Sequence, residues 1–226
     1  PTEGTTFDTM AVSPDGRMLA FTAADASGKI SLWVRSLDSL TAHMLPSTEG
    51  AAFPFWSPDS RFVGYSAQSQ LYKIAVSGGP PHMICARDGT RGATWSPNGV
   101  ILLSPNSATP LLKVSANGGE AVAATNLDAS RGEVSHRWPY FLPDGRHYLF
   151  TMRGDQRDVP GIYVGSLDSS VPKRLTGDLS NAAYAASPSG AGYLLFARGR
   201  SLLARPLDLD RLEFTGEEVA VEDNVW

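Results

Sequence analysis

The side chains that could do chemistry are few, and they fall outside the established catalytic motifs. The four histidines are His43, His82, His136 and His147. No Gly-x-Ser-x-Gly elbow and no His-Glu-x-x-His pair occurs in the sequence. His136 precedes Arg137 and Trp138 at the start of a predicted β-strand. No partner carboxylate or nucleophile is evident in the sequence. We therefore expect His136 to pack or to form hydrogen bonds, and we predict that the chain is not an enzyme.

Aspartates recur at one position of a repeated phrase. Asp15, Asp59 and Asp144 each follow a proline, one in each of three repeats. Such residues would be distributed around a repeat protein, whereas a metal ion needs several oxygen ligands around one point. Turn formation explains the aspartates better than metal binding does. We expect no metal site and no cofactor.

The phrase that contains these aspartates occurs five times. Its copies lie at 13–22, 57–66, 96–103, 142–151 and 187–196, with prolines at 14, 58, 97, 143 and 188. In the clearest copies proline presets φ, aspartate favours the next position, and glycine supplies a left-handed residue, which together predict a tight hairpin turn. The prolines are 44, 39, 46 and 45 residues apart. A repeat of that length is typical of propellers and solenoids.

Strand-like segments follow each turn in a constant order. The segment 32–37 recurs as 71–76, 111–116, 162–167 and 202–207, and a turn and a short fourth strand follow each copy. No segment has a helical apolar period over about ten residues. The pattern predicts an all-β fold: one β-propeller region with four-stranded antiparallel blades at about 7–50, 51–90, 91–135, 136–180 and 181–226. Because the first unit begins with an innermost strand and the last ends with an outermost one, we expect these five blades to belong to a six- or seven-bladed ring.

The composition argues against several kinds of partner. The formal charge of −4 offers no basic patch for nucleic acid, and no apolar run is long enough to span a membrane. The single cysteine, Cys85, stands in an apolar stretch, so we expect a buried and inert thiol. A chain that starts at Pro1 without methionine is typical of a processed or excised segment.

Alignment of the repeats on their turn prolines indicates where a ligand would bind. It places Asp8, Arg91 and Arg137 at one depth of the innermost strands, with His136 and Trp138 beside Arg137. Two neighbouring arginines favour carboxylate or phosphate groups, and the tryptophan adds an aromatic wall. We therefore predict a binding site for an anionic or peptide-like ligand at the channel mouth, formed by these five residues. The alternative, that the arginines pair with acidic residues between blades, stays open.

The repeats resemble a known family. Copies of Ser-Pro-Asp-Gly-Arg followed by a Leu-Tyr/Trp-x-Val strand are similar to the WD-like propeller repeats of the TolB family. The phrases at 135–147 and 161–168 resemble the propeller regions of bacterial proteins that also carry a serine/threonine kinase domain and a membrane segment. That resemblance covers essentially the whole chain and implies an extracytoplasmic sensor, while the kinase motifs themselves are absent from the sequence. The repeat is specific for the fold and uninformative about the task, because propellers perform many tasks.

These observations lead to one expected function and two alternatives. We expect a non-catalytic interaction or sensor module that binds a protein, a peptide or a small anionic ligand. It would lie in the periplasm or another extracytoplasmic space, tethered through a membrane segment outside this chain, and it could dimerise through open terminal blades. The first alternative is a propeller that gates a prolyl-oligopeptidase-like hydrolase whose catalytic domain is absent here. The second is a lyase or glycosidase propeller, which requires converging carboxylates, and only Asp8 of the predicted site is one.

Overall fold

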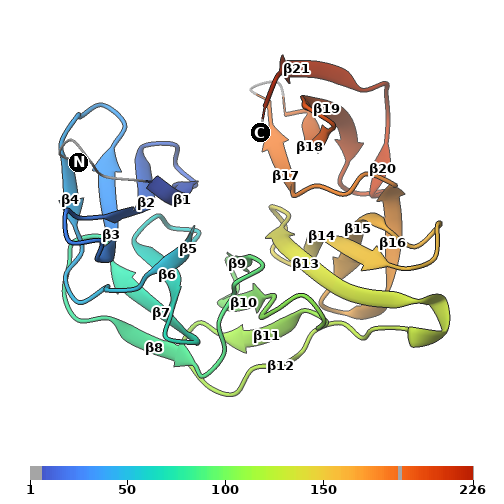
Figure 1. Ribbon diagram of the computed structural model, residues 1–226. Helices are drawn as coiled ribbons and strands as arrows, with labels where there is room; N and C mark the ends of the chain where they lie inside the picture. The colour runs from blue at the N-terminus through green and yellow to red at the C-terminus, as the bar shows by residue number, and fades with distance from the viewer. Residues whose placement is uncertain (1–6, 188–189, 226) are drawn as a thin grey trace. The chain divides into compact units, whose positions relative to one another are not determined.

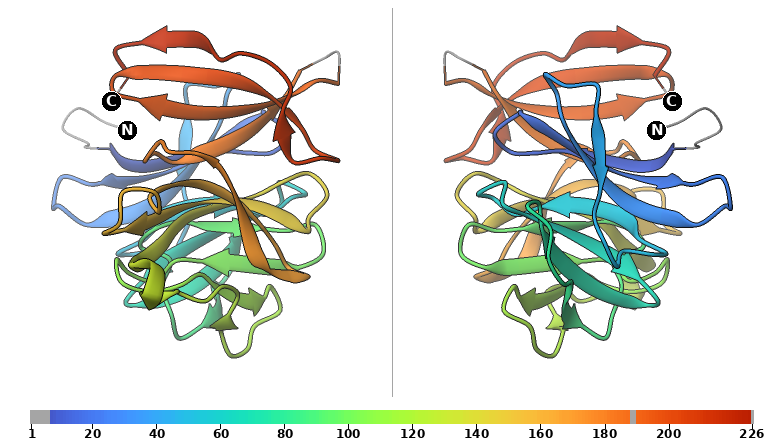
Figure 2. Two further views of the ribbon diagram at one scale, coloured as in Figure 1. Left: turned by 90° about the vertical axis from the view of Figure 1, so that its right-hand side faces the viewer. Right: turned by 90° about the vertical axis from the view of Figure 1, so that its left-hand side faces the viewer.

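The chain folds into five antiparallel β-sheets, which are the predicted blades (Figure 1). The computed structural model describes residues 7–187 and 190–225, with side chains from residue 9 onward. In each blade the strands lie side by side in chain order, as the red and orange strands of the fifth blade show clearly in Figure 2. The predicted all-β fold of five four-stranded blades, a β-propeller, is confirmed. Membership of a larger six- or seven-bladed ring stays a prediction.

The strand bounds follow the repeats. The first blade contains β1 (Phe7–Val12), β2 (Met18–Ala24), β3 (Ile30–Ser36) and β4 (Ala42–Met44). The second contains β5 (Ala52–Trp56), β6 (Phe62–Ala67), β7 (Gln70–Ala75) and β8 (His82–Cys85). The third contains β9 (Ala93–Trp95), β10 (Val100–Leu103), β11 (Leu112–Ser115) and β12 (Val122–Ala123).

The last two blades have longer strands. The fourth contains β13 (Glu133–Phe141), β14 (His147–Gly154), β15 (Gly161–Ser166) and β16 (Ser169–Thr176). The fifth contains β17 (Ala182–Ala186), β18 (Gly192–Arg198) and β19 (Ser201–Asp208), and its outer position is shared by β20 (Glu213–Phe214) and β21 (Val219–Asp223). A single 3₁₀ turn, η1 (Ala129–Arg131), precedes β13. Strand β13 thus begins before the predicted boundary at 135/136, because Glu133 already pairs with Gly154 of β14.

The chain divides into two compact units. Unit 1 contains the first three blades, and unit 2 contains the last two together with the segment Ser107–Leu111. We call this segment, which lies between β10 and β11 in the sequence, loop 107–111. Each unit has a core between its sheets: Ala20, Leu32 and Val34 pack against Trp56 and Tyr65 in unit 1. Leu149 and Ile162 pack against Leu194 and Phe196 in unit 2.

The hairpin turns form as the repeated phrase predicts. Ser13 donates its hydroxyl to Asp15 at 2.5 Å and accepts the N–H of Met18 at 2.9 Å. The hydrogen bond from Ser13 lowers the pKa of the Asp15 carboxyl. Gly16 has φ +69°, and Ser60 adopts φ +58° at the equivalent position of the second blade. The copy at 187–196 is described without Pro188 and Ser189, which lie outside the described residues.

Buried hydroxyl groups recur in three blades, and two of them bond to the segment that leads into the next blade. They belong to Thr22, Ser66 and Thr151, at the same position of the second strand. Ser66 accepts the N–H of Gly89 at 2.9 Å, and Thr151 donates to the carbonyl of Ser180 at 2.6 Å. Gly89 and Ser180 each lie in the segment that leads into the next blade. These bonds therefore fix the blade junctions, because a buried polar group costs stability when it is left unbonded.

The environment of the single cysteine agrees with the sequence. Cys85 is buried and free, as predicted, and its burial raises the pKa of the thiol. Among the described residues, no helix has the length and apolar character needed to cross a bilayer.

The need for a left-handed residue in the turn can be tested by opposite substitutions at Gly16 and Ser60, which occupy equivalent positions. Gly16→Ala should lower the free energy of unfolding by about 1 kcal/mol, because a side chain in the left-handed region is strained. No heavy atom lies within 4 Å of the added Cβ, so steric conflict would not contribute. Ser60→Gly relieves the same strain but removes the hydroxyl that accepts the N–H of Asp15 at 3.3 Å, so it should raise stability by less than Gly16→Ala lowers it. Urea denaturation measures both, and a loss of stability in Ser60→Gly would contradict this account.

Removal of the Thr151 hydroxyl at the blade junction should lower the free energy of unfolding by a larger amount. Thr151→Val keeps the shape of the side chain and removes the donor for the Ser180 carbonyl, so the free energy of unfolding should fall by about 1–3 kcal/mol. Thr41→Val makes the same chemical change at an exposed position and should cost less than about 0.5 kcal/mol. Equal losses in the two variants would show that the junction bond contributes nothing specific.

Candidate functional site

Three of the five predicted site residues are consecutive on the innermost strand of the fourth blade. His136, Arg137 and Trp138 lie on β13, where the pairing with β14 shifts register between Arg137 and Tyr140. At this bulge Trp138 has φ +52°. A left-handed conformation is costly for an aromatic residue, and Phe53 has the same φ at the equivalent bulge of β5. A bulge also changes the direction of the side chains beside it.

His136 is a buried histidine with its hydrogen bonds inside unit 2. Its side chain is 1% exposed, and its ring centroid lies 4.8 Å from that of Phe150. Its Nδ1 is 2.8 Å from the hydroxyl of Thr125, which also accepts the N–H of Leu111 at 2.9 Å. The Thr125 oxygen already receives this N–H, so its own proton is free to go to Nδ1. We assign the neutral tautomer with its proton on Nε2, because the carboxylate of Glu133 lies 3.6 Å from that nitrogen.

A carboxylate lies on the other side of the ring. The Oε2 atom of Glu133 is 3.6 Å from His136 Nε2. Glu133 also accepts the N–H of Asp128 at 2.9 Å and lies 3.5 Å from the guanidinium of Arg131. Its negative charge is therefore already shared, and burial dominates: it lowers the pKa of His136 to about 4. The histidine is neutral at pH 7.

Arg137 makes hydrogen bonds to two neutral oxygen atoms of unit 2. Its Nε donates to the hydroxyl of Ser135 at 2.9 Å, and its Nη2 donates to the carbonyl of Ser107 at 3.0 Å. The Arg137 side chain is partly exposed. Beyond the bulge, Tyr140 is 37% exposed and donates its hydroxyl to the carbonyl of Tyr184 on β17 at 3.2 Å. The strand thus carries an oriented guanidinium at Arg137, followed by a tryptophan and a tyrosine.

The other two predicted residues belong to unit 1. Arg91 is exposed in the turn before β9, and its N–H donates to the carbonyl of Ser104 at 2.9 Å. Asp8 is on β1, and its side chain lies outside the described residues. Convergence of Asp8 and Arg91 with the β13 residues stays a prediction.

Sequence reasoning missed the partners of His136. Glu133 is three residues away, which on a regular strand would point it to the opposite face. The register shift between Glu133 and Ser135 allows the two side chains to meet. Thr125 and loop 107–111 lie farther away in the sequence. Neither carries a motif that would identify it as a partner of His136. Only the carboxylate at 133 was close enough in sequence to be considered.

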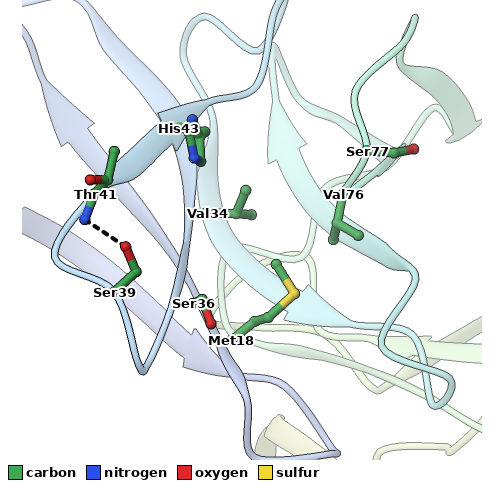
Figure 3. A pocket seen from close by; sticks show the side chains of 8 residues that line it. All are labelled: Met18, Val34, Ser36, Ser39, Thr41, His43, Val76 and Ser77. Atoms are coloured by element: carbon green, nitrogen blue, oxygen red, sulfur yellow. Dashed lines mark hydrogen bonds between the residues drawn. The ribbon is translucent and has the colours of Figure 1, made fainter.

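A separate depression lies in unit 1, between the first and second blades (Figure 3). Its volume is about 490 Å³, and it is lined by Met18, Val34, Ser36, Ser39, Thr41, His43, Val76 and Ser77. Hydroxyl groups and an exposed imidazole surround an apolar floor of methionine and valine. None of the predicted site residues lines it, and no Asp, Glu, Lys or Arg is among the lining residues that could neutralise a charged ligand.

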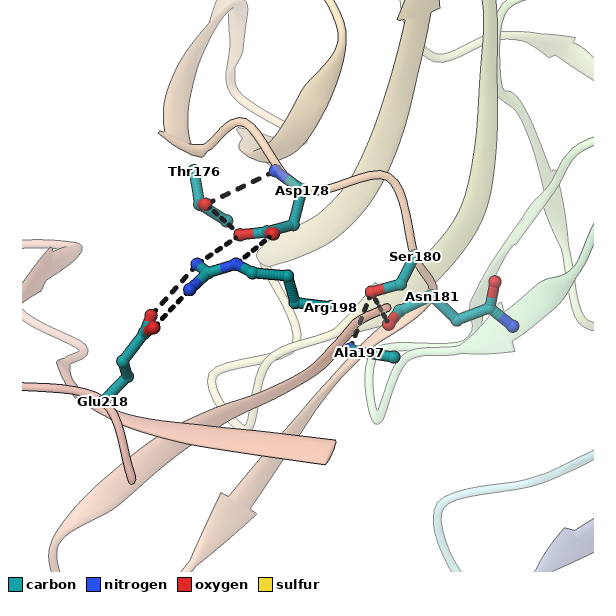
Figure 4. Close-up of polar contacts among 7 residues, drawn as sticks. All are labelled: Thr176, Asp178, Ser180, Asn181, Ala197, Arg198 and Glu218. Atoms are coloured by element: carbon teal, nitrogen blue, oxygen red, sulfur yellow. Dashed lines mark hydrogen bonds and ion pairs between the residues drawn. The ribbon is translucent and has the colours of Figure 1, made fainter. Parts of the chain in front are cut away.

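An ion-pair cluster lies at the junction of the last two blades (Figure 4). Arg198 of β18 donates to both oxygens of Asp178, at 2.7 and 3.0 Å, and pairs with Glu218 as well. The arginine lowers the pKa of the Asp178 carboxyl. These contacts connect the segment before β17 to the segment before β21, so the cluster is structural.

Metal binding gains no support from the described side chains. Within residues 9–187 and 190–225 no three His, Cys, Asp or Glu residues gather as a metal site. Asp59 instead accepts the hydroxyl of Ser57 at 2.6 Å and the N–H of Arg61 at 3.1 Å inside its own turn. Asp144 likewise accepts two backbone N–H groups at 2.9 Å.

Burial of His136 predicts a pH-dependent stability. The folded-state pKa of about 4 lies below the ordinary value of about 6.5. Between these two pH values His136 binds a proton in the unfolded chain and stays neutral in the folded chain. Stability should therefore be complete above pH 6.5 and fall by about 3 kcal/mol as the pH falls toward 4. Urea denaturation at several pH values would show this as a difference between wild type and His136→Gln. The exposed-histidine variant His82→Gln should behave as wild type, and a flat difference curve for His136→Gln would contradict the assignment.

Comparisons with known proteins bear on the fold. No family model matches the chain, and no curated protein sequence does so either. The structure of TolB from Acinetobacter baumannii has a TM-score of 0.71 at 15% identity, with 97% of this chain and 55% of TolB covered. A TolB candidate from Agrobacterium tumefaciens has a TM-score of 0.64 at 20% identity, with 96% and 81% covered.

Enzyme-related structures match as well. A dipeptidyl aminopeptidase IV candidate from Bacteroides ovatus has a TM-score of 0.59 at 11% identity, with 99% of this chain and 42% of that chain covered. The chain spans about half the length of the Acinetobacter structure. At these identities the likeness concerns the fold alone, and the resemblance to kinase-associated propellers stays a prediction. The chain has the β-propeller fold of TolB-like proteins.

Proposed function

We propose that the chain is a non-catalytic interaction module, and that the bulge of β13 binds an acidic segment of a protein or peptide. The observation that carries this proposal is the guanidinium of Arg137, which Ser135 and Ser107 hold in place at a partly exposed position. An arginine recognises a carboxylate through two parallel N–H···O bonds, and a fixed guanidinium loses less entropy on binding than a free one.

The surroundings of Arg137 support a peptide more than a free ion. Trp138 and the 37% exposed Tyr140 offer aromatic surface on either side of the bulge. Aromatic residues and arginine are the side chains most enriched in protein interfaces. A peptide with a carboxylate beside an apolar residue would match both features.

The nearest approach to a catalytic arrangement is the hydroxyl–imidazole–carboxylate series of Thr125, His136 and Glu133. Two facts speak against catalysis there. The Thr125 oxygen is already bonded to the N–H of Leu111, and a histidine with a pKa of about 4 is a weak base at neutral pH. The series supports a structural role, and so we extend the proposal to say that this chain has no enzymatic activity of its own.

Finer parts of the proposal rest on resemblance. The repeats resemble those of TolB and of kinase-associated propellers, which favours an extracytoplasmic sensor tethered by a segment outside this chain. The aminopeptidase candidate among the structural matches keeps one alternative in view: a propeller that controls access to a hydrolase domain. That alternative needs a catalytic domain elsewhere in the same protein.

Binding of fluorescein-labelled hexa-aspartate, followed by fluorescence anisotropy at low salt, tests the site. Arg137→Ala should weaken the affinity about ten- to a hundredfold, because one charge-assisted hydrogen-bonding group is lost. Arg137→Lys keeps the charge without the two-pronged geometry and should fall between wild type and the alanine variant. The control is Arg157→Ala, an exposed arginine in the segment between β14 and β15.

Equal weakening in Arg137→Ala and Arg157→Ala would mean that the peptide senses only the overall charge. That outcome, or an unchanged affinity in Arg137→Ala, would refute the site. Hexalysine carries the opposite charge and should not bind.

A further inference from the structure

We propose that His136 is a positioning residue for the Arg137 site: together with Thr125 it fastens loop 107–111 to β13, and it releases the loop when the imidazole takes up a proton. This inference rests on the proposed function, because it concerns how the same arginine is held. Under this proposal the buried side chain of His136 supports loop 107–111 and also makes the attachment of the loop depend on pH.

The hydrogen bonds that hold the loop include three to loop residues and a fourth that joins Thr125 to the ring of His136. The N–H of His136 donates to the carbonyl of Thr109 at 3.1 Å, and the N–H of Leu111 donates to the Thr125 hydroxyl at 2.9 Å. That hydroxyl is 2.8 Å from His136 Nδ1, and the N–H of Ala124 donates to the carbonyl of Leu111 at 2.8 Å. Two of the four bonds are made by His136 itself, one through its backbone and one through its ring.

The loop in turn holds the arginine. The Nη2 atom of Arg137 donates to the carbonyl of Ser107, the first residue of the loop. If the loop leaves β13, Arg137 loses one of the hydrogen bonds that orient it, while its bond to Ser135 stays. A released loop therefore leaves a guanidinium that must be ordered again when a ligand binds, at a cost in affinity.

Protonation acts on the bond that joins the ring to the loop. In the neutral tautomer Nδ1 accepts the proton of the Thr125 hydroxyl, whereas the imidazolium carries a proton on both nitrogens. The Thr125 hydroxyl would have to turn its proton elsewhere while it still receives the N–H of Leu111. The new charge would also lie in a ring environment that is 1% exposed and packed against Phe150.

The Glu133 carboxylate, 3.6 Å from the ring, offsets this penalty only in part. Glu133 of β13 would attract the imidazolium, but Arg131 of η1 and the N–H of Asp128 already share its carboxylate. From β15, Tyr163 has a raised pKa because of burial, so it is neutral when the histidine titrates. Burial accordingly keeps the pKa of His136 near 4 while the loop is fastened, against about 6.5 for a solvated ring. By linkage, opening of the loop becomes about tenfold more favourable at pH 5.5 than at pH 7.5.

Hydrogen exchange of the full chain, resolved to single amides, tests the proposal without a ligand. Once corrected for intrinsic exchange rates, the protection of the Leu111 amide should fall about tenfold from pH 7.5 to pH 5.5. The amide of Phe196 on β18 reports global unfolding, whose free energy falls through the same linkage. Low urea concentrations separate the two openings: they should speed exchange at Phe196 and leave that of Leu111 unchanged. Thr125→Val removes the fastening hydroxyl and should lower the protection of Leu111 at both pH values.

His136→Gln should remove the difference between the two pH values. If this variant does not fold, an NMR titration of wild-type His136 replaces it: the Leu111 amide shift should follow the imidazole titration with a midpoint well below 6.5. A Leu111 shift that ignores that titration counts against the proposal. So does equal protection of Leu111 at pH 7.5 and pH 5.5.

A second measurement connects the loop to the binding site. Hexa-aspartate should raise the protection of Leu111 in the wild type and not in Arg137→Ala, because a ligand that prefers the fastened loop shifts the equilibrium toward it. Failure of the binding site has a different signature: Arg137→Ala would bind the peptide as the wild type does, while the pH response of Leu111 persisted. Bound peptide with no added protection of Leu111 would refute the coupling between loop and arginine.

Discussion

Hydroxyl groups buried at the blade junctions are the interaction on which the rest of the structure depends. Thr151 bonds to the carbonyl of Ser180, and Ser66 accepts the N–H of Gly89. A buried polar group left unbonded costs more than a formed bond gains, so each hydroxyl fixes the segment that leads to the next strand. Thr125 uses the same principle toward Leu111. The candidate site is therefore built from the bonds that also hold the fold.

Local chemistry made most of the fold predictable. The proline turn of the repeat is specified by residues that are adjacent in sequence. Its five related copies, of which 13–16 is Ser-Pro-Asp-Gly, reveal the number of blades and the order of strands. The strand that begins at Glu133 was placed too late, because its first residues lie before the aligned part of the repeat. The buried hydroxyls of Thr22, Ser66 and Thr151 each follow an aromatic residue, so their recurrence can be seen in the sequence. Their hydrogen-bond partners cannot be found in this way.

The site was predictable only where it follows the repeat. The structure places His136, Arg137 and Trp138 on one innermost strand, and their role as a ligand site stays a prediction. Alignment on the turn prolines could not reveal the bulge, since a residue before proline is normally extended and Trp138 instead has φ +52° before Pro139. Phe53 has the same φ before Pro54 on β5, so the conformation belongs to the repeat and is stabilised by packing that no short segment encodes.

The same burial determines what His136 can and cannot do. In a solvated turn the imidazole would titrate near neutral pH and could accept protons from a substrate. Enclosed by Phe150 and bonded to Thr125, it stays neutral until the solution is strongly acidic, which removes most of its value as a base. A neutral ring with one accepting nitrogen is well suited to hold a hydroxyl, and through it a loop. The chemistry that weakens the case for catalysis on β13 is thus the chemistry that makes β13 a precise support for Arg137.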